Sequence, residues 1–219
     1  EYANMPVDVQ KDEEKGLYYV QKEKKRLYFR KSTPAKKIQK YYRALSMEQD
    51  RRSPHHYFNS VKEVTGKVFV DVGCAEGYSS LEIIEEAKHV YLFEQDEQWL
   101  EAIRATFEPW QDKVTIVQKY VSDHNSSREQ TLDDFFNNQT NEHLFLKMDI
   151  EGAERHALAG CNNLFQNCQK LDFAICTYHL RDDEEVISAF LDKHNCTYIN
   201  QKGFFRHKIR SVVMRGSKK

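Results

Sequence analysis

The sequence predicts a Rossmann-like α/β fold, in which a mainly parallel β-sheet carries helices on both faces. Two observations lead to this prediction. From residue 61 onward, short runs of β-branched and aromatic residues alternate with stretches of helical periodicity, which is typical of repeated strand–helix–strand units. The first of these runs, at 67–71, ends in a turn that contains two glycines, Gly73 and Gly77. Such a turn commonly leads from the first strand of an open α/β sheet into a helix.

Each element of this fold follows from a local pattern. The expected strands lie at 67–71, 89–94, 113–118, 144–149 and 171–178, and runs at 197–200 and 209–214 predict an antiparallel closing hairpin. The expected helices lie at 78–87, 153–165 and 183–193, and one more begins after Asp96, a residue type that caps helix N-termini. A short segment at 132–136 follows a polar loop.

Residues 1–60 differ from the rest of the chain. Aromatic-rich runs at 16–20 and 26–30 predict a hairpin, and Pro34 opens a helix. In that helix Ile38, Tyr41, Tyr42 and Leu45 recur at helical spacing and need a surface to cover. We therefore divide the chain into an N-terminal extension at 1–60, with an expected acceptor-binding or lid role, and a core domain at 61–219.

Composition limits the class of protein. The chain has 219 residues, 31% of them charged, and contains no apolar run of about 18 residues, so no membrane span is expected. Five scattered cysteines form no CxxC pair, which predicts reduced thiols, a cytoplasmic protein and no zinc site. The segment 21–43 holds ten Lys or Arg residues and one acid. It fits either a phosphate-binding patch or a solvated helix face.

The turn after the first strand reads Asp-x-Gly-x-x-x-Gly from Asp71 to Gly77. It lacks the G-x-G-x-x-G pattern that seats pyrophosphate on a helix N-terminus. An acid here would repel pyrophosphate but suits a ligand that carries an ammonium and a sulfonium group. Glu94, at the end of the second strand, can accept two hydrogen bonds from a ribose diol.

The end of the fourth strand carries three carboxylates, on Asp149, Glu151 and Glu154. Close acids at the mouth of a pocket are costly unless they are used or paired. Glu154 falls in a first helical turn, where the helix dipole favours an acid regardless of function. His179, at the end of the fifth strand, lies beside this site in a parallel sheet and could accept a proton from a hydroxyl group.

At this point the sequence resembles a known family. The segments Phe69 to Leu81, Phe93-Glu94, Val121 to Asp123, Thr131 to Asp133 and Leu146 to Glu154, with Leu158-Ala-Gly160, are similar to the FkbM-type methyltransferases. The resemblance covers roughly residues 53 to 178, and its most specific part is the block from Lys147 to Glu154. Two departures are Glu76, where the family has a different residue type, and Gln95, where it commonly has Pro.

The resemblance implies a class I S-adenosylmethionine-dependent fold and O-methylation of a sugar, glycan or related metabolite. It implies no step through a covalent enzyme intermediate, so the protein must align the acceptor and manage one proton. The candidate catalytic residues are Asp149, Glu151 and His179. The candidate cofactor-binding residues are Asp71, Gly73, Cys74, Ala75, Gly77, Tyr78, Glu94, Gln95, Val121, Ser122, Asp123 and Asp149.

Several alternatives remain open at this stage. The carboxylates could act as bases or could hold Mg²⁺, although no metal ligand set is predicted. Other hypotheses are a nucleic-acid or other small-molecule methyltransferase, a nicotinamide-dependent oxidoreductase, and a non-catalytic module that binds S-adenosylmethionine. The missing G-x-G-x-x-G pattern argues against the oxidoreductase. The absence of an aromatic Asn/Asp-Pro-Pro-Tyr-type motif after the fourth strand argues against nucleic acid as a partner.

Overall fold

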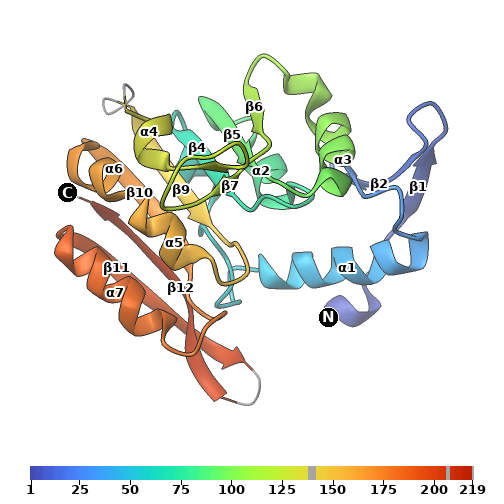
Figure 1. The fold of residues 1–219 in the computed structure, drawn as a ribbon. Helices are drawn as coiled ribbons and strands as arrows, with labels where there is room; N and C mark the ends of the chain where they lie inside the picture. Colours follow the sequence, from blue (N-terminus) through green and yellow to red (C-terminus); the bar gives the residue numbers. More distant parts are fainter. Residues whose placement is uncertain (138–141, 206–207, 219) are drawn as a thin grey trace.

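A seven-stranded sheet forms the centre of the molecule (Figure 1). The computed structural model describes residues 1–137, 142–205 and 208–218. The strand order is β11-β12-β10-β9-β4-β5-β6. In chain order these strands are β4 (Val68–Val72), β5 (His89–Phe93), β6 (Val114–Val117), β9 (His143–Met148), β10 (Lys170–Cys176), β11 (Cys196–Phe205) and β12 (Lys208–Lys218). Five strands run parallel, and β12 pairs antiparallel with both β10 and β11. The predicted Rossmann-like fold with an antiparallel closing hairpin is confirmed.

The strand order reverses beside β4. The chain builds β4, β5 and β6 outward in one direction and then returns to place β9 on the other side of β4. Open α/β sheets bind ligands at the carboxyl ends of the strands that flank such a reversal. Val72, the last residue of β4, is paired with Met148 in β9 and with Phe93 in β5. The residues that follow these three strands therefore meet at one edge of the sheet.

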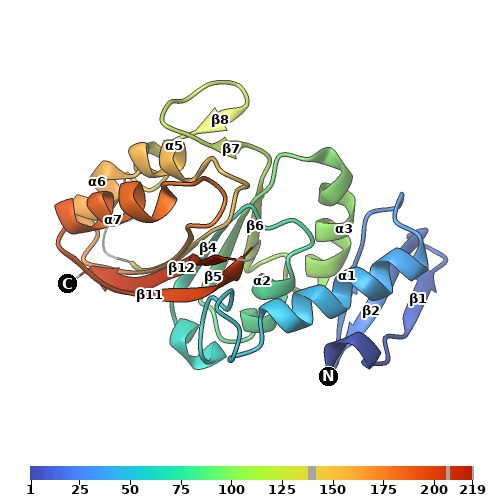
Figure 2. The ribbon, with the colours of Figure 1, turned by 90° about the horizontal axis from the view of Figure 1, so that it is seen from below.

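Helices cover both faces of the sheet (Figure 2). They are α1 (Ala35–Glu48), α2 (Tyr78–Ile83), α3 (Glu97–Phe107), α4 (Leu132–Phe135), α5 (Glu154–Ala159), α6 (Asn162–Asn167) and α7 (Asp183–Lys193), with short 3-10 turns at Tyr2–Asn4, Val61–Val64 and Glu108–Trp110. Alternate residues of one strand point to opposite faces. Accordingly, Phe69 belongs to the apolar cluster under α1, α2 and α3, whereas Val68 and Val70 belong to the cluster under α4 to α7.

The N-terminal extension forms a separate three-stranded antiparallel sheet and helix α1. The sheet comprises β1 (Val9–Asp12), β2 (Leu17–Lys22) and β3 (Lys25–Tyr28), of which β1 was not predicted. Leu27, Phe29 and Ile38 are fully buried in the same apolar cluster as α2 and α3. The amide of Tyr28 donates to the hydroxyl of Thr106 in α3 at 3.0 Å. The extension is thus packed on the core, as the apolar stripe of its helix predicts.

Three expected boundaries were wrong. The helix expected at 153–165 is broken into α5 and α6 at Gly160, where a Cβ would collide with the carbonyl oxygen of Ser122. The helix expected at 78–87 ends at Ile83 and is followed by a turn, in which the amides of Glu86 and Ala87 bind the carbonyl of Ile83. The closing strands are longer than expected, since they pair with each other over almost their full length.

Two further features complete the fold. A two-stranded parallel ribbon, β7 (Tyr120–Val121) and β8 (Glu129–Gln130), was not predicted and lies beyond β6 along the chain. Over the described ranges, no helix is long and apolar enough to span a bilayer.

Candidate active site

One cavity of about 1240 Å³ opens at the carboxyl ends of β4, β5 and β9. Small-molecule sites usually measure about 300–1,000 Å³, so this cavity has room for a cofactor and an acceptor together. Helix α1 contributes Tyr41, Leu45, Glu48 and Gln49 to its wall. The predicted site residues that line it are Asp71, Gly73, Cys74, Ala75, Tyr78, Glu94, Gln95, Val121, Ser122, Asp123, Asp149 and Glu151. Gly77 and His179 are not among the lining residues.

The turn after β4 is held against the end of β9. Gly73 has a φ of 77°, and a Cβ there would collide with the carbonyl oxygen of Asp149, so only glycine permits this approach. The buried carboxylate of Asp71 lies 2.7 Å from Nζ of Lys147 and accepts a hydrogen bond of 2.6 Å from Ser80. Nζ of Lys147 also donates to the carbonyl of Gly73 at 2.7 Å. Asp71 and Lys147 thus fix the turn from inside the protein.

Gly77 supports the turn from behind. Its φ is 80°, and a Cβ at this position would lie 2.6 Å from the ring of Phe107 in α3. Gly77 therefore allows α2 and α3 to pack closely rather than facing the cavity.

Glu94 is oriented by backbone donors. Its Oε2 accepts from the amide of Ala75 at 3.0 Å, and its Oε1 accepts from the amide of Asp96 at 2.8 Å. Each carboxylate oxygen can accept more than one hydrogen bond, so both can still receive a hydroxyl from the cavity. This geometry suits a ribose diol, and it fits the nucleoside part of S-adenosylmethionine.

Asp123 lies at another part of the cavity wall. Its Oδ1 lies 2.7 Å from Nδ1 of His124, and its Oδ2 lies 3.6 Å from Nδ1 of His156. The hydrogen bond with His124 is the main cause that lowers the pKa of Asp123. The carboxylate therefore remains ionised, next to Val121 and Ser122, which with Asp123 are candidate cofactor-binding residues.

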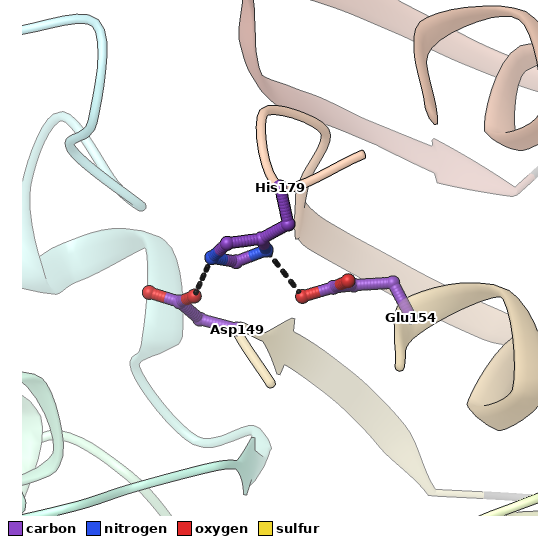
Figure 3. A group of neighbouring side chains, drawn as sticks. All are labelled: Asp149, Glu154 and His179. Atoms are coloured by element: carbon purple, nitrogen blue, oxygen red, sulfur yellow. Dashed lines mark ion pairs between the residues drawn. The ribbon is translucent and has the colours of Figure 1, made fainter. Parts of the chain in front are cut away.

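Asp149, Glu154 and His179 come together at the carboxyl ends of β9 and β10 (Figure 3). The imidazole of His179 lies between the two carboxylates, with Nε2 3.4 Å from Oδ1 of Asp149 and Nδ1 2.8 Å from Oε1 of Glu154. Oε2 of Glu151 lies 3.7 Å from the same Nε2. The turn that joins Asp149 to Glu154 has positive φ values of 56° at Glu151 and 100° at Gly152. This turn lets Glu154 reach back and accept the amide of Ile150 at 2.9 Å.

The carboxylates around His179 and Lys147 favour the positively charged forms of these two side chains. Burial opposes protonation of His179, but the hydrogen bond and charge of Glu154, with the charges of Asp149 and Glu151, outweigh burial and raise its pKa. Burial likewise opposes the charge of Lys147, yet Asp71 and Asp149 raise the pKa of this lysine. Around His179 and Lys147 there are therefore more carboxylates than cations.

Three residues of the N-terminal extension were not predicted in the site. The hydroxyl of Tyr57 donates to Oδ2 of Asp149 at 2.7 Å. The hydroxyl of Tyr41 in α1 donates to Oε2 of the buried Glu76 at 2.7 Å, which explains an acid at this unusual place in the cofactor turn. Burial, followed by the charges of Asp149, Glu76 and Glu151, raises the pKa of Glu48 to about 7.

The sequence signals for these contacts were weak. The helical stripe of α1 includes Tyr41, but nothing in the sequence specifies its partner. Glu154 was interpreted as a helix-dipole acid, and only the turn before it brings the side chain to His179.

Solved structures of methyltransferases share the fold of this chain. The structure of a methyltransferase FkbM from Methylobacillus flagellatus is similar over 84% of this chain and 55% of that one, with a TM-score of 0.56 and 16% identity. Magnesium protoporphyrin IX methyltransferase from Synechocystis, solved with bound S-adenosylmethionine, is similar over 86% of both chains, with a TM-score of 0.53 and 12% identity. The present chain thus spans little more than half of the FkbM structure. A search of curated proteins found no match.

The sheet order, the glycine turn and the ligand edge at the reversal define a Rossmann-like class I methyltransferase fold. Residues 53–199 match the model of the methyltransferase FkbM domain. The chain therefore belongs to the FkbM methyltransferase family.

Proposed function

We propose that the protein transfers the methyl group of S-adenosylmethionine to a hydroxyl oxygen of a sugar, glycan or related metabolite. The observation that carries the proposal is a carboxylate–imidazole group: Asp149 and Glu151 line the cavity, and the buried side chain of His179 contacts both carboxylates. Such a group can take a proton from a hydroxyl, which is a weak nucleophile while protonated.

The cavity wall supports the choice of cofactor. Glu94 presents two oriented oxygens to a diol, and the turn from Gly73 to Ala75 brings backbone close to the same space. The cavity lining also includes the acids Glu48, Asp149 and Glu151, which suit a cationic sulfonium. No pyrophosphate seat of the dinucleotide type is present in the sequence of this turn.

The reaction is a single displacement. S-adenosylmethionine supplies an electrophilic methyl group bound to its sulfonium sulfur. When the acceptor oxygen attacks the methyl carbon, the sulfur leaves as the neutral thioether of S-adenosylhomocysteine. The oxygen–carbon bond forms as the carbon–sulfur bond breaks, and the hydroxyl proton passes to the Asp149–Glu151–His179 group. Tyr57 holds Oδ2 of Asp149, so Oδ1 is the oxygen that remains directed toward His179.

The basic segment at 21–43 is only partly available to a phosphate-bearing ligand. Several of its cations are engaged within the protein: Lys22 pairs with Glu82, Lys25 donates to the carbonyl of Leu81, and Arg30 pairs with Asp96. A patch that binds phosphates would leave these charges free for the ligand.

A methyl-transfer screen tests the proposal. The protein is incubated with isotope-labelled S-adenosylmethionine and a panel of nucleotide sugars, free glycans and RNA, and products are mapped by mass spectrometry. We expect a methyl ether on a hydroxyl-bearing acceptor. Transfer to nitrogen in a nucleic acid, or binding of labelled NADH in place of the cofactor, would overturn the proposal.

A further inference from the structure

Unsatisfied polar atoms concentrate in one place. Among the described residues, six buried side-chain polar atoms lack an aligned hydrogen bond, and two of these are Nε of Arg30 and Oδ1 of Asp71. The other four are Oδ1 of Asp149, Oε2 of Glu154 and both ring nitrogens of His179. Glu154 is fully buried and the side chain of His179 is 8% exposed. His179 and Asp149 contact each other only as an ion pair without aligned hydrogen bonds, and buried polar atoms that lack aligned hydrogen bonds are rare in native proteins and call for a water, an ion or a functional reason.

The spacing of these atoms fits a shared ion. One ligand atom from each of Asp149, Glu154 and His179 lies within 4.8 Å of the other two. Nε2 of His179 and Oδ1 of Asp149 are 3.4 Å apart. Two ligands that bind one ion at about 2.1 Å are separated by about 3.0–3.4 Å in octahedral or tetrahedral geometry. A direct hydrogen bond would be shorter and aligned.

A second histidine–aspartate pair in the same sheet provides the contrast. Nε2 of His143 lies 2.7 Å from Oδ2 of Asp172, at hydrogen-bond distance, and leaves no room for an ion. The pair at His179 is wider and unaligned, and it differs in having a carboxylate on the other ring nitrogen as well. A histidine that binds a metal through one nitrogen almost always gives the other to a carboxylate or carbonyl, and Glu154 occupies that place.

The excess of negative charge around His179 also favours a bound cation. Two shielded carboxylates, on Asp149 and Glu154, flank His179, and a third, on the 91% exposed Glu151, lies 3.7 Å from Nε2. Lys147 already pairs with Asp71. Even with a protonated imidazole, the group holds more negative than positive charge, and Glu154 is fully buried. A divalent cation would supply the missing charge.

We propose that His179, through Nε2, and Asp149, through Oδ1, bind a divalent transition-metal ion, with Glu154 orienting the imidazole and Glu151 closing the site from the cavity side. The imidazole ligand selects Mn²⁺, Fe²⁺, Co²⁺ or Zn²⁺ over Mg²⁺ and Ca²⁺, which take oxygen ligands. The proposal that an ion binds rests on the distances between Asp149, Glu154 and His179 and does not depend on the proposed function. The catalytic role of the ion rests on the proposed function: at the cavity wall the ion would bind the acceptor hydroxyl and acidify it.

Metal titration of the full chain tests the inference. Mn²⁺ is titrated into the chelator-treated protein, with and without S-adenosylhomocysteine, and followed by electron paramagnetic resonance and calorimetry. We expect one ion per chain, and a melting temperature raised by about 5–10 °C at 100 times the dissociation constant. Asp149→Asn and His179→Ala should each weaken binding more than tenfold, and Glu154→Gln by about 10- to 100-fold.

His143→Ala is the matched control, because it removes a histidine from an ordinary ion pair in the same sheet. It should leave Mn²⁺ affinity unchanged. Far-ultraviolet circular dichroism verifies the fold of each variant, and Asp149→Asn keeps the test valid if the buried substitutions unfold the chain. Absence of saturable binding, or equal affinity in Asp149→Asn and the native protein, overturns the inference. Methyl transfer that persists in chelator would then leave the proposed function standing.

Discussion

Glu48 offers the sharpest test of how charge is distributed around the cavity. It lies at the end of α1 with its carboxylate half-buried, and no hydrogen bond or ion pair of this carboxylate is found among the described residues. Burial and the charges of Asp149, Glu76 and Glu151 raise its pKa from 4.5 to about 7. Glu48→Gln keeps the shape of the side chain and removes the charge.

The size and sign of the effect follow from linkage. Between pH 4.5 and 7 the folded protein retains a proton on Glu48 that the unfolded chain has released, so stability from this group is lost as the pH rises through that window. A shift of about 2.5 units corresponds to a ceiling of about 3.4 kcal/mol. Because the side chain is partly exposed and solvent screens its neighbours, about 1–2 kcal/mol is the expected penalty. Glu48→Gln should therefore raise the melting temperature by about 2–8 °C at pH 8.

Thermal unfolding at pH 5 and pH 8 measures this difference. At pH 5 most of the penalty is absent, so the native protein and Glu48→Gln should unfold within about 1–2 °C of each other. The exposed Glu101 of α3 provides the control, and Glu101→Gln should show no pH-dependent gain. An equal gain for Glu48→Gln at both pH values, or a loss at pH 8, would refute the electrostatic reasoning.

Three further predictions follow from the site. S-adenosylhomocysteine should raise the melting temperature whereas NAD should not, and Glu94→Ala should remove most of the shift; a shift with NAD alone would contradict the cofactor assignment. Asp149→Asn and His179→Ala should each lower turnover by about 10²- to 10⁴-fold with cofactor affinity nearly unchanged, which single-turnover kinetics and calorimetry would establish; full activity in both would exclude the carboxylate–imidazole group. Tyr41→Phe should lower the free energy of unfolding by about 1–3 kcal/mol, measured with denaturant, because Glu76 loses its hydrogen-bond donor. The double variant Tyr41→Phe with Glu76→Gln should recover part of this loss. Equal stability of the native protein and Tyr41→Phe would show that the contact contributes nothing.

The sequence was informative wherever function depends on the end of a strand. Gly73, Glu94 and Asp149 were each placed by a local pattern, and their meeting follows from the strand order because β4 lies between β5 and β9. Periodicity identifies strands and helices, and topology rules then bring strand ends together. The meeting of these strand ends at one cavity could therefore be predicted from residues far apart in the chain, and their binding of the cofactor stays a prediction.

Register and turn geometry could not be predicted in the same way. Asp71 and Lys147 are direct neighbours in the pairing of β4 with β9, but a periodic pattern fixes the face of a strand and not its register with the next. The contacts of the Asp71 carboxylate with Lys147 and Ser80 were therefore not predicted, and its assignment to the cofactor stays a prediction. The helix expected at 153–165 failed for a related reason, since the close approach of Ser122 at Gly160 is a tertiary constraint.

Helix α1 adds residues to the cavity that lie outside the segment matched by the family model. The family match begins at residue 53, yet Tyr41 and Glu48 belong to α1, before the match, and both line the cavity. Tyr41 also contacts the cofactor turn through Glu76, so the extension and the motif share one hydrogen-bonded surface. Residues that bind the cofactor can then remain the same while the helix opposite them changes shape and charge. We therefore expect acceptor choice to follow α1, and exchange of residues 35–49 with those of another family member should alter the acceptor while S-adenosylhomocysteine still binds.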